Sequence, residues 1–119
     1  MAKILVVDDS SFARATMRRR LEEAGYTVIE ADSGQRALEL AAREKPDLAT
    51  LDLLMPGMSG NETLAQLRPL YPALKILVVS ADVQALTRQE VLAAGANGFL
   101  NKPVATVDLL ATVSKLLAE

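Results

Sequence analysis

Five short apolar runs with little polar alternation constrain the fold of this chain more than any other feature. They lie at residues 4–7, 27–29, 48–51, 76–79 and 98–100. Unbroken apolar runs of this length are typical of parallel strands that helices cover on both faces. The second run ends in Glu30, which favours a place at the edge of the sheet. The pattern therefore predicts a sheet of five strands.

The segments between these runs have the spacing of helices. Apolar residues recur at Ala13, Met17, Leu21 and Ala24 in the first segment, and at Leu109, Val113, Leu116 and Leu117 in the last. Gly25 and Gly95 fall where a helix would end in a left-handed residue. Strict alternation of strand and helix predicts a (βα)5 α/β domain with a parallel sheet, because right-handed crossovers place helices on both faces.

The third helix has clear end signals. Ser59 and Glu62 have the spacing of a capping box, and Pro69 and Pro72 are expected to stop the helix. The start of the fourth helix is less defined. Thr87 with Glu90 also fits a capping box, which would start that helix near Arg88, but a start near Gln84 is equally compatible with the sequence.

Size and charge limit the classes of function. The 119 residues, half of them hydrophobic, fit one domain spanning residues 1–119. A formal net charge of -2 favours neither nucleic acid nor an anionic membrane as a direct partner. Asp8 and Asp9 stop the first apolar run too early for a signal peptide or a membrane span, so we expect a cytoplasmic protein.

Polar residues follow the predicted strands and point to a metal site. The carboxyl ends of parallel strands meet at one edge of a sheet, where such folds bind their ligands. Asp8, Asp9 and Asp52 fall at this edge, and crowded carboxylates repel one another unless a cation fills the site. With no His and no Cys in the chain, the ligands must be oxygens, which favours Mg²⁺ or Mn²⁺.

The same edge carries the groups that phosphoryl transfer needs. A carboxylate such as Asp52 can attack phosphorus if the charge on the transferring oxygens is neutralised. The Lys102 ammonium and the Ser80 hydroxyl can contact those oxygens beside the metal.

Each residue also has an ordinary structural interpretation. The acidic pair with Ser10 could simply cap the first helix, Asp52 could form a turn, Ser80 could satisfy backbone groups, and Lys102 could be a solvated lysine. Arg18, Arg19 and Arg20 are more often a solvated helix face than a nucleic-acid site, although a kinase could dock at this helix. The combination of groups at separate strand ends favours the functional interpretation.

Five segments resemble the receiver domains of bacterial two-component systems, in particular the stand-alone, CheY-like chemotaxis type. The resemblance runs from end to end and is carried by residues 6–10 (VVDDS), 51–60 (LDLLMPGMSG), 79–81 (VSA), 94–96 (AGA) and 98–103 (GFLNKP). It implies a doubly wound, flavodoxin-like fold with strand order 2-1-3-4-5. It also implies that Asp52 accepts a phosphoryl group from a histidine kinase or a small phosphodonor.

The resemblance also implies individual roles. Asp9, Asp52 and the backbone carbonyl of Leu54 would bind Mg²⁺, and Asp8 would act through water. Lys102 would contact the phosphoryl group, and its bond to Pro103 would be cis.

Output in this family is conformational. Ser80 would move to the phosphoryl group and Phe99 would turn into the vacated space, a two-state switch in which packing alone must act because Phe99 lacks a hydroxyl. Phe99 could also be a simple core residue. We expect a monomer that signals to a protein partner through the fourth helix, fifth strand and fifth helix, with chemotaxis as the pathway that the resemblance favours.

Two residues near the acceptor bear on the lifetime of the phosphoryl group. The apolar side chain of Leu54 cannot orient a water molecule, and Asp82 could either hold water or repel it. Slow hydrolysis and dependence on a separate phosphatase are the expected result.

Other functions remain as alternatives. A phosphatase of the haloacid dehalogenase kind needs a second aspartate two residues after the first, where this chain has Leu54. Such enzymes also have a cap domain, which we do not expect in this chain. A receiver that is never phosphorylated would serve only as a binding module. The chain could also be a phosphocarrier in a phosphorelay, or the receiver of a longer response regulator. We therefore expect a signalling protein rather than an enzyme.

Overall fold

Strands and helices alternate strictly along the chain. A computed structural model describes residues 2–82 and 84–119. The elements are, in order, β1 (Lys3–Val7), α1 (Ser11–Glu23), β2 (Thr27–Ala31), α2 (Gly34–Glu44), β3 (Leu48–Leu51), α3 (Gly60–Leu70), β4 (Lys75–Ser80), α4 (Ala85–Ala93), β5 (Gly98–Asn101) and α5 (Thr106–Ala118). The (βα)5 prediction is confirmed.

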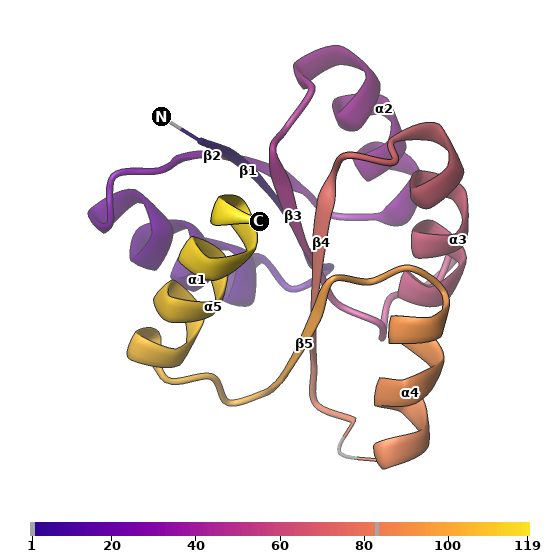
Figure 1. The fold of residues 1–119 in the computed structure, drawn as a ribbon. Helices are drawn as coiled ribbons and strands as arrows, with labels where there is room; N and C mark the ends of the chain where they lie inside the picture. Colours follow the sequence, from indigo (N-terminus) through magenta and orange to yellow (C-terminus); the bar gives the residue numbers. More distant parts are fainter. Residues whose placement is uncertain (1, 83) are drawn as a thin grey trace.

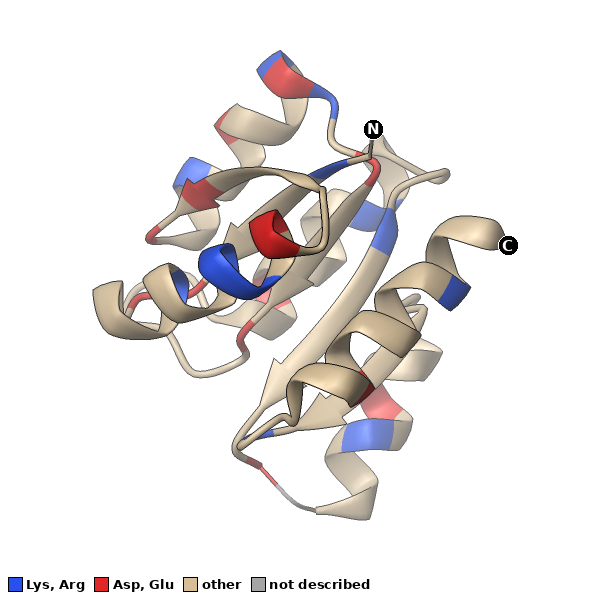
Figure 2. Cartoon of the chain, turned by 90° about the vertical axis from the view of Figure 1, so that its left-hand side faces the viewer, with Lys and Arg blue, Asp and Glu red and all other residues tan. Residues whose placement is uncertain are grey.

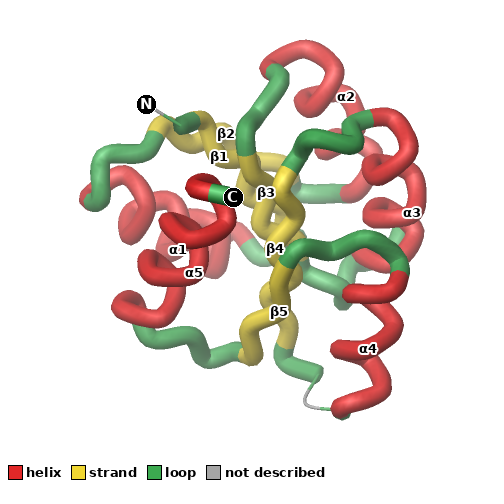
Figure 3. Tube along the Cα trace, in the orientation of Figure 1, coloured by secondary structure: helices red, strands yellow, loops and turns green. Residues whose placement is uncertain are grey.

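The five strands form one parallel sheet in the order β2-β1-β3-β4-β5. This is the order that the resemblance implied, and β2 is at the edge as expected. Figure 3 shows the strands as a single layer with helices on either side. Because β1 and β3 are neighbours at the centre, the residues that follow them leave the sheet next to each other.

The helices divide into two groups that cover opposite faces of the sheet (Figure 1). On one face, α1 and α5 pack through Leu21, Leu109 and Val113 against alternate residues of the central strands. On the other face, α2, α3 and α4 pack against the remaining strand residues. Both faces are therefore buried, which explains why the strands lack polar alternation.

Several helix ends follow the predicted signals. Gly25 and Gly95 have positive φ angles of 99° and 110° after α1 and α4. Ser59 and Glu62 form the predicted capping box at the start of α3. The prediction that Pro69 stops this helix is wrong, because α3 continues through Pro69 to Leu70. A proline in the last turn removes only one backbone hydrogen bond, so the helix tolerates it there.

The start of α4 settles the choice between the two predicted boundaries. The helix begins at Ala85 with Gln84 at the N-cap position, and the side chain of Gln84 makes no capping hydrogen bond. The capping box predicted at Thr87 and Glu90 is therefore wrong. The Thr87 hydroxyl instead donates a hydrogen bond of 2.8 Å to Oδ2 of Asp82, in the loop before the helix.

The described residues contain no helix that is both long and apolar enough to span a membrane.

Candidate phosphoacceptor and metal site

Backbone hydrogen bonds continue past the ends of the strands and draw the site residues together. The Asp8 N–H donates to the Ala31 carbonyl at 3.2 Å, and the Asp52 N–H donates to the Val7 carbonyl at 3.1 Å. At the other side of the sheet, the Lys102 N–H donates to the Ser80 carbonyl at 2.8 Å. The parallel pairing thus fixes the directions in which these residues leave the sheet.

The loop between β3 and α3 turns back closely beneath Asp52. The Gly60 N–H donates to the Leu53 carbonyl at 3.0 Å, and a Cβ atom on Gly60 would overlap the carbonyl oxygen of Asp52. The Leu54 N–H donates to Oδ1 of Asp52 at 3.2 Å. This tight turn holds the backbone of Leu54 next to the Asp52 carboxylate, while its side chain is 67% exposed.

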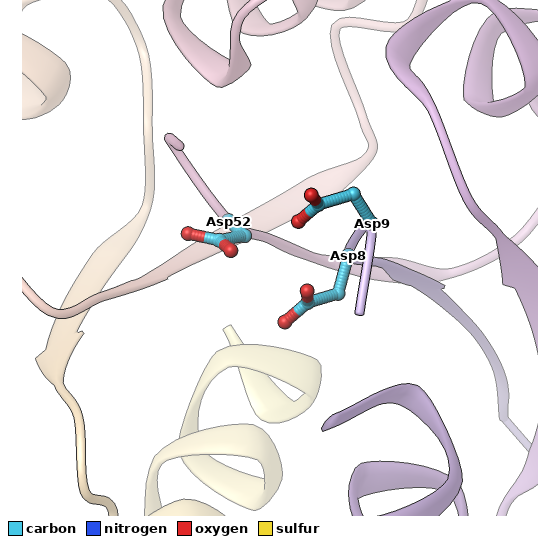
Figure 4. Close-up of side chains that lie close together, drawn as sticks. All are labelled: Asp8, Asp9 and Asp52. Atoms are coloured by element: carbon cyan, nitrogen blue, oxygen red, sulfur yellow. The ribbon is translucent and has the colours of Figure 1, made fainter. Parts of the chain in front are cut away.

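Three carboxylates converge at the carboxyl ends of β1 and β3 (Figure 4). One oxygen from each of Asp8, Asp9 and Asp52 lies within 4.8 Å of the others. Asp8 and Asp52 are buried, whereas Asp9 is exposed. Like charges at this spacing repel one another, and burial strengthens the repulsion because less water screens it.

Lys102 is a partial counter-ion for this cluster. Its Nζ lies 2.9 Å from Oδ2 of Asp8 and 3.4 Å from Oδ2 of Asp52. Burial by itself would lower the pKa of Lys102, but the hydrogen bond to Asp8 and the charges of Asp52 and Asp8 outweigh it and raise the pKa. Lys102 is therefore an ammonium ion at neutral pH, and it balances one of the three negative charges.

The negative charge of the Asp52 carboxylate is unfavourable at its position. Burial is the largest effect and raises the pKa of Asp52 above its ordinary value, and the Asp8 charge acts in the same direction. The Leu54 N–H and the Lys102 ammonium oppose this shift without cancelling it. A further positive charge at the cluster would reduce the repulsion between the carboxylates and lower the pKa of Asp52.

The donor set fits a small divalent cation. Carboxylate oxygens are the ligands that Mg²⁺ prefers, and the three oxygens are close enough to one another to surround one such ion. Two negative charges are left after pairing with Lys102, which matches the charge of such an ion.

Ser80 and Phe99, the two predicted switch residues, are both buried. Ser80 is 0% exposed at the end of β4, and its Oγ accepts a hydrogen bond of 3.1 Å from the Asp82 N–H. Phe99 is 8% exposed and packs in the same apolar cluster as Val78 and Val91. The Phe99 ring is therefore already turned inward in this arrangement. The bond between Lys102 and Pro103 is cis, as the resemblance implied.

Two contacts near the site could not be read from the sequence. Nη1 of Arg14 donates to the Asp8 carbonyl at 2.7 Å, and Nε of Arg14 pairs with Glu30 at 3.2 Å. An arginine in the first turn of a helix is too common to indicate such a role.

The carboxylate of Asp82, expected to hold or repel water, accepts hydrogen bonds from Thr87 and from the backbone of its own loop.

Comparisons with known proteins agree with this fold and site. The family model of the response regulator receiver domain matches residues 4–114. The chain therefore belongs to the response regulator receiver family, the signal-receiving modules of two-component systems. The resemblance read from the sequence motifs is confirmed at this level.

The individual relatives are of two kinds. Response regulator MprA of Mycobacterium leprae is 43% identical over 115 residues, and that of Mycobacterium ulcerans is 44% identical. Both alignments cover 97% of this chain but 50% of the regulator, so the chain spans about half the length of these relatives.

Among solved structures, chemotaxis protein CheY4 of Vibrio cholerae is 36% identical with a TM-score of 0.93, and 98% of each chain is covered. A CheY-like receiver domain protein of Methanospirillum hungatei is 30% identical with a TM-score of 0.94, covering 99% of this chain and 94% of the other.

Proposed function

We propose that residues 1–119 form one receiver domain that accepts a phosphoryl group on Asp52 with the help of a divalent cation. The observation that carries this proposal is the convergence of Asp8, Asp9 and Asp52 within 4.8 Å, with the Lys102 ammonium placed against two of them. A structural cap or turn would not require this concentration of charge. The family membership of the chain supports the same function.

The chemistry is an in-line transfer. One oxygen of Asp52 forms a bond to phosphorus while the bond from phosphorus to the donor breaks, which leaves an acyl phosphate on Asp52 and returns the electron pair to the donor. With a histidine kinase the broken bond is phosphorus–nitrogen. Lys102 and Ser80 stabilise the charge on the transferring oxygens, the first as an ammonium ion and the second as a hydroxyl donor.

Asp8, Asp9, Asp52 and the Leu54 carbonyl are the residues that would hold Mg²⁺, with Mn²⁺ as a substitute. When bound, the cation neutralises charge on the carboxylates and on the phosphoryl oxygens. Asp9 is exposed, so the site is open to a phosphodonor on that side. Asp8 is buried and paired with Lys102, which favours an indirect contact through water.

A histidine kinase is the proposed donor, and an apolar groove beside the site suits its approach. The groove has a volume of about 430 Å³ and runs between α1 and the loop after β5, with Phe12, Met17, Pro103 and Val104 among its lining residues. Phe12 is 81% exposed at its mouth. Figure 2 shows acidic and basic residues on α1, whereas α5, which ends at the C-terminus, is mostly uncharged.

Output is proposed to pass to a protein partner through α4, β5 and α5. Leu86 on α4 and Val107 on α5 are 61% and 74% exposed, which gives this face apolar contacts. Ser80 and Phe99 lie behind it and are the proposed switch residues. Since Phe99 is already turned inward, the larger movement in the switch is expected at Ser80 and in the loop that follows it.

Two pathways suit this receiver. The likeness to the chemotaxis protein CheY4 favours a chemotaxis signal carrier. The higher identity to MprA, of which the chain spans half, favours the receiver of a longer response regulator. Pull-down experiments from the host, comparing beryllofluoride-loaded protein with Asp52→Asn, would distinguish them through the partners that are recovered.

Phosphorylation itself can be tested with a small phosphodonor. We expect acetyl phosphate and Mg²⁺ to add one base-labile phosphate, visible by mass spectrometry and missing from Asp52→Asn. The exposed apolar Leu54 should let the adduct persist for minutes or longer. No adduct would contradict the proposal, steady turnover of a soluble substrate would favour an enzyme, and a lifetime of seconds would contradict the predicted role of Leu54.

A further inference from the structure

Asp82 connects three elements around the proposed switch residue through four separate atoms. Its N–H donates to Oγ of Ser80 at 3.1 Å, and its carbonyl accepts from Nδ2 of Asn101 at 2.7 Å. Its Oδ1 accepts from the Gln84 N–H at 2.9 Å, and its Oδ2 accepts from Oγ1 of Thr87 at 2.8 Å. One residue thus joins the end of β4, the end of β5 and the first turn of α4.

The carboxylate of Asp82 links its loop to the first turn of α4. Gln84 occupies the N-cap position but makes no side-chain capping bond, and the Asp82 carboxylate holds the start of the helix through the Gln84 N–H and the Thr87 hydroxyl. The Gln84 N–H, and then the Thr87 hydroxyl, hold the pKa of Asp82 below its usual value. The carboxylate therefore stays charged at neutral pH and keeps both bonds.

The Ser80 hydroxyl is constrained by the same residue. A serine hydroxyl has one proton to donate and two lone pairs. In the described arrangement one lone pair takes the Asp82 N–H, which holds the hydroxyl toward the β4–α4 loop. If Ser80 turns to donate its proton to a phosphoryl oxygen on Asp52, the Asp82 N–H must either follow it or lose its acceptor. Movement of Asp82 in turn strains the bonds to Thr87 and Asn101.

We infer that Thr87 is a positioning residue: its hydrogen bond to Asp82 holds Ser80 in the phosphate-free arrangement and is given up when Ser80 engages the phosphoryl group. The inference rests on the proposed function, because it concerns how Ser80 responds to Asp52. By linkage, a partner that draws Thr87 away from Asp82 would strengthen binding at Asp52, since coupling between two sites is reciprocal.

The test compares Thr87→Val, which removes the hydroxyl but keeps the shape, with Thr87→Ser, which keeps the hydroxyl. Beryllofluoride with Mg²⁺ is titrated into each protein and into wild type, and the bound fluoride is followed by ¹⁹F NMR. We expect Thr87→Val to reach half-saturation at about tenfold less beryllofluoride, which corresponds to about 1.4 kcal/mol. Thr87→Ser should remain close to wild type.

The outcomes separate this inference from the proposed function. Wild type that binds beryllofluoride, with equal or weaker binding by Thr87→Val, would overturn the inference, as would failure of Thr87→Ser to restore the wild-type value. Wild type that binds no more beryllofluoride than Asp52→Asn would overturn the proposed function instead. In that case the hydrogen-exchange rate of the Asp82 amide tests the inference. Faster exchange in Thr87→Val than in wild type supports the link from Thr87 to Ser80, and an unchanged rate overturns it.

Discussion

The carboxylate of Asp52 is placed where its negative charge is costly. Burial raises its pKa, and the nearby Asp8 charge adds to the effect, while Lys102 offsets only part of it. A carboxyl group whose pKa is higher in the folded state binds a proton more tightly when folded than when unfolded. Folding is therefore favoured as the pH falls through that raised pKa, and the ionised group lowers stability at neutral pH.

Neutralising Asp52 should accordingly stabilise the metal-free protein. We expect Asp52→Asn to raise Tm at pH 7 in the presence of a chelator by a few degrees, because the amide removes the charge and keeps the shape. The gain should shrink as the pH is lowered toward the acid range, where the wild-type carboxyl also becomes neutral. Thermal unfolding followed by circular dichroism, at pH 7 and at acid pH, measures the gain in Tm and its decrease. A lower Tm for the variant at pH 7 would contradict the assigned effect of burial.

Residues at this scale differ in how far the sequence predicts them. Asp8, Asp9 and Asp52 could be placed together because each follows an apolar strand, and parallel strands end at one edge of the sheet. The hydrogen-bond partners of Asp82 could not be predicted in this way. Its partners depend on the path of the β4–α4 loop, which leaves no periodic signal in the sequence.

Arg68 joins the elements that lie far from the site. It extends from the last turn of α3 and donates five hydrogen bonds, to the carbonyls of Tyr71, Pro72, Leu74 and Gly95 and to the side chain of Asn97. Partial burial lowers its pKa, which is the cost of drawing the guanidinium from water. These hydrogen bonds connect the α3–β4 loop to the α4–β5 loop at the amino end of the sheet.

Loss of these bonds should weaken the whole domain. We expect Arg68→Met, which keeps the aliphatic stem, to lower the free energy of unfolding by about 2 kcal/mol, since bonds from charged donors exceed neutral ones in strength. Urea denaturation measures the change. Arg43→Met is the matched control, because Arg43 forms an exposed pair with its neighbour Glu44 and should change stability by less than about 0.5 kcal/mol. Equal effects would refute the special role of Arg68.

Element boundaries were predicted well where local chemistry decides them. The capping box of Ser59 and Glu62 and the left-handed Gly25 and Gly95 needed no tertiary contact. The end of α3 and the start of α4 were different. The Arg68 side chain donates to carbonyls after α3, and Asp82 accepts from Gln84 and Thr87 at the start of α4, so contacts beyond the local sequence signals influence these ends.

At the scale of the molecule, the two apolar clusters stabilise the fold, and the carboxyl edge of the sheet carries the candidate site. Strand order could be predicted only through resemblance, because the apolar runs do not say which strands are neighbours. Strand number, helix alternation and burial of both faces followed from the pattern of apolar runs alone. The global arrangement then determines which loops meet.

Magnesium should stabilise the entire domain through this one site. A ligand that binds only the folded state adds about 2.7 kcal/mol when its concentration is 100 times its Kd. We therefore expect Mg²⁺ to raise Tm of wild type and a chelator to reverse the effect. Asp9→Asn should reduce the increase, because it removes the exposed ligand and leaves the buried pair with Lys102.

The control for this measurement is KCl at matched ionic strength, which screens charges but does not bind specifically. An equal rise of Tm with K⁺, or an unchanged rise in Asp9→Asn, would contradict a specific cation site at the three carboxylates.

The hydrogen bond from Lys102 to Asp8 joins residues 94 positions apart in the chain. During synthesis, the first carboxylates emerge from the ribosome long before the lysine that partly neutralises them. A nascent chain halted before β5 therefore has Asp8 and Asp52 without the ammonium group that pairs with them. The proposed transfer of a phosphoryl group to Asp52 therefore requires that the chain has been synthesised at least as far as Lys102.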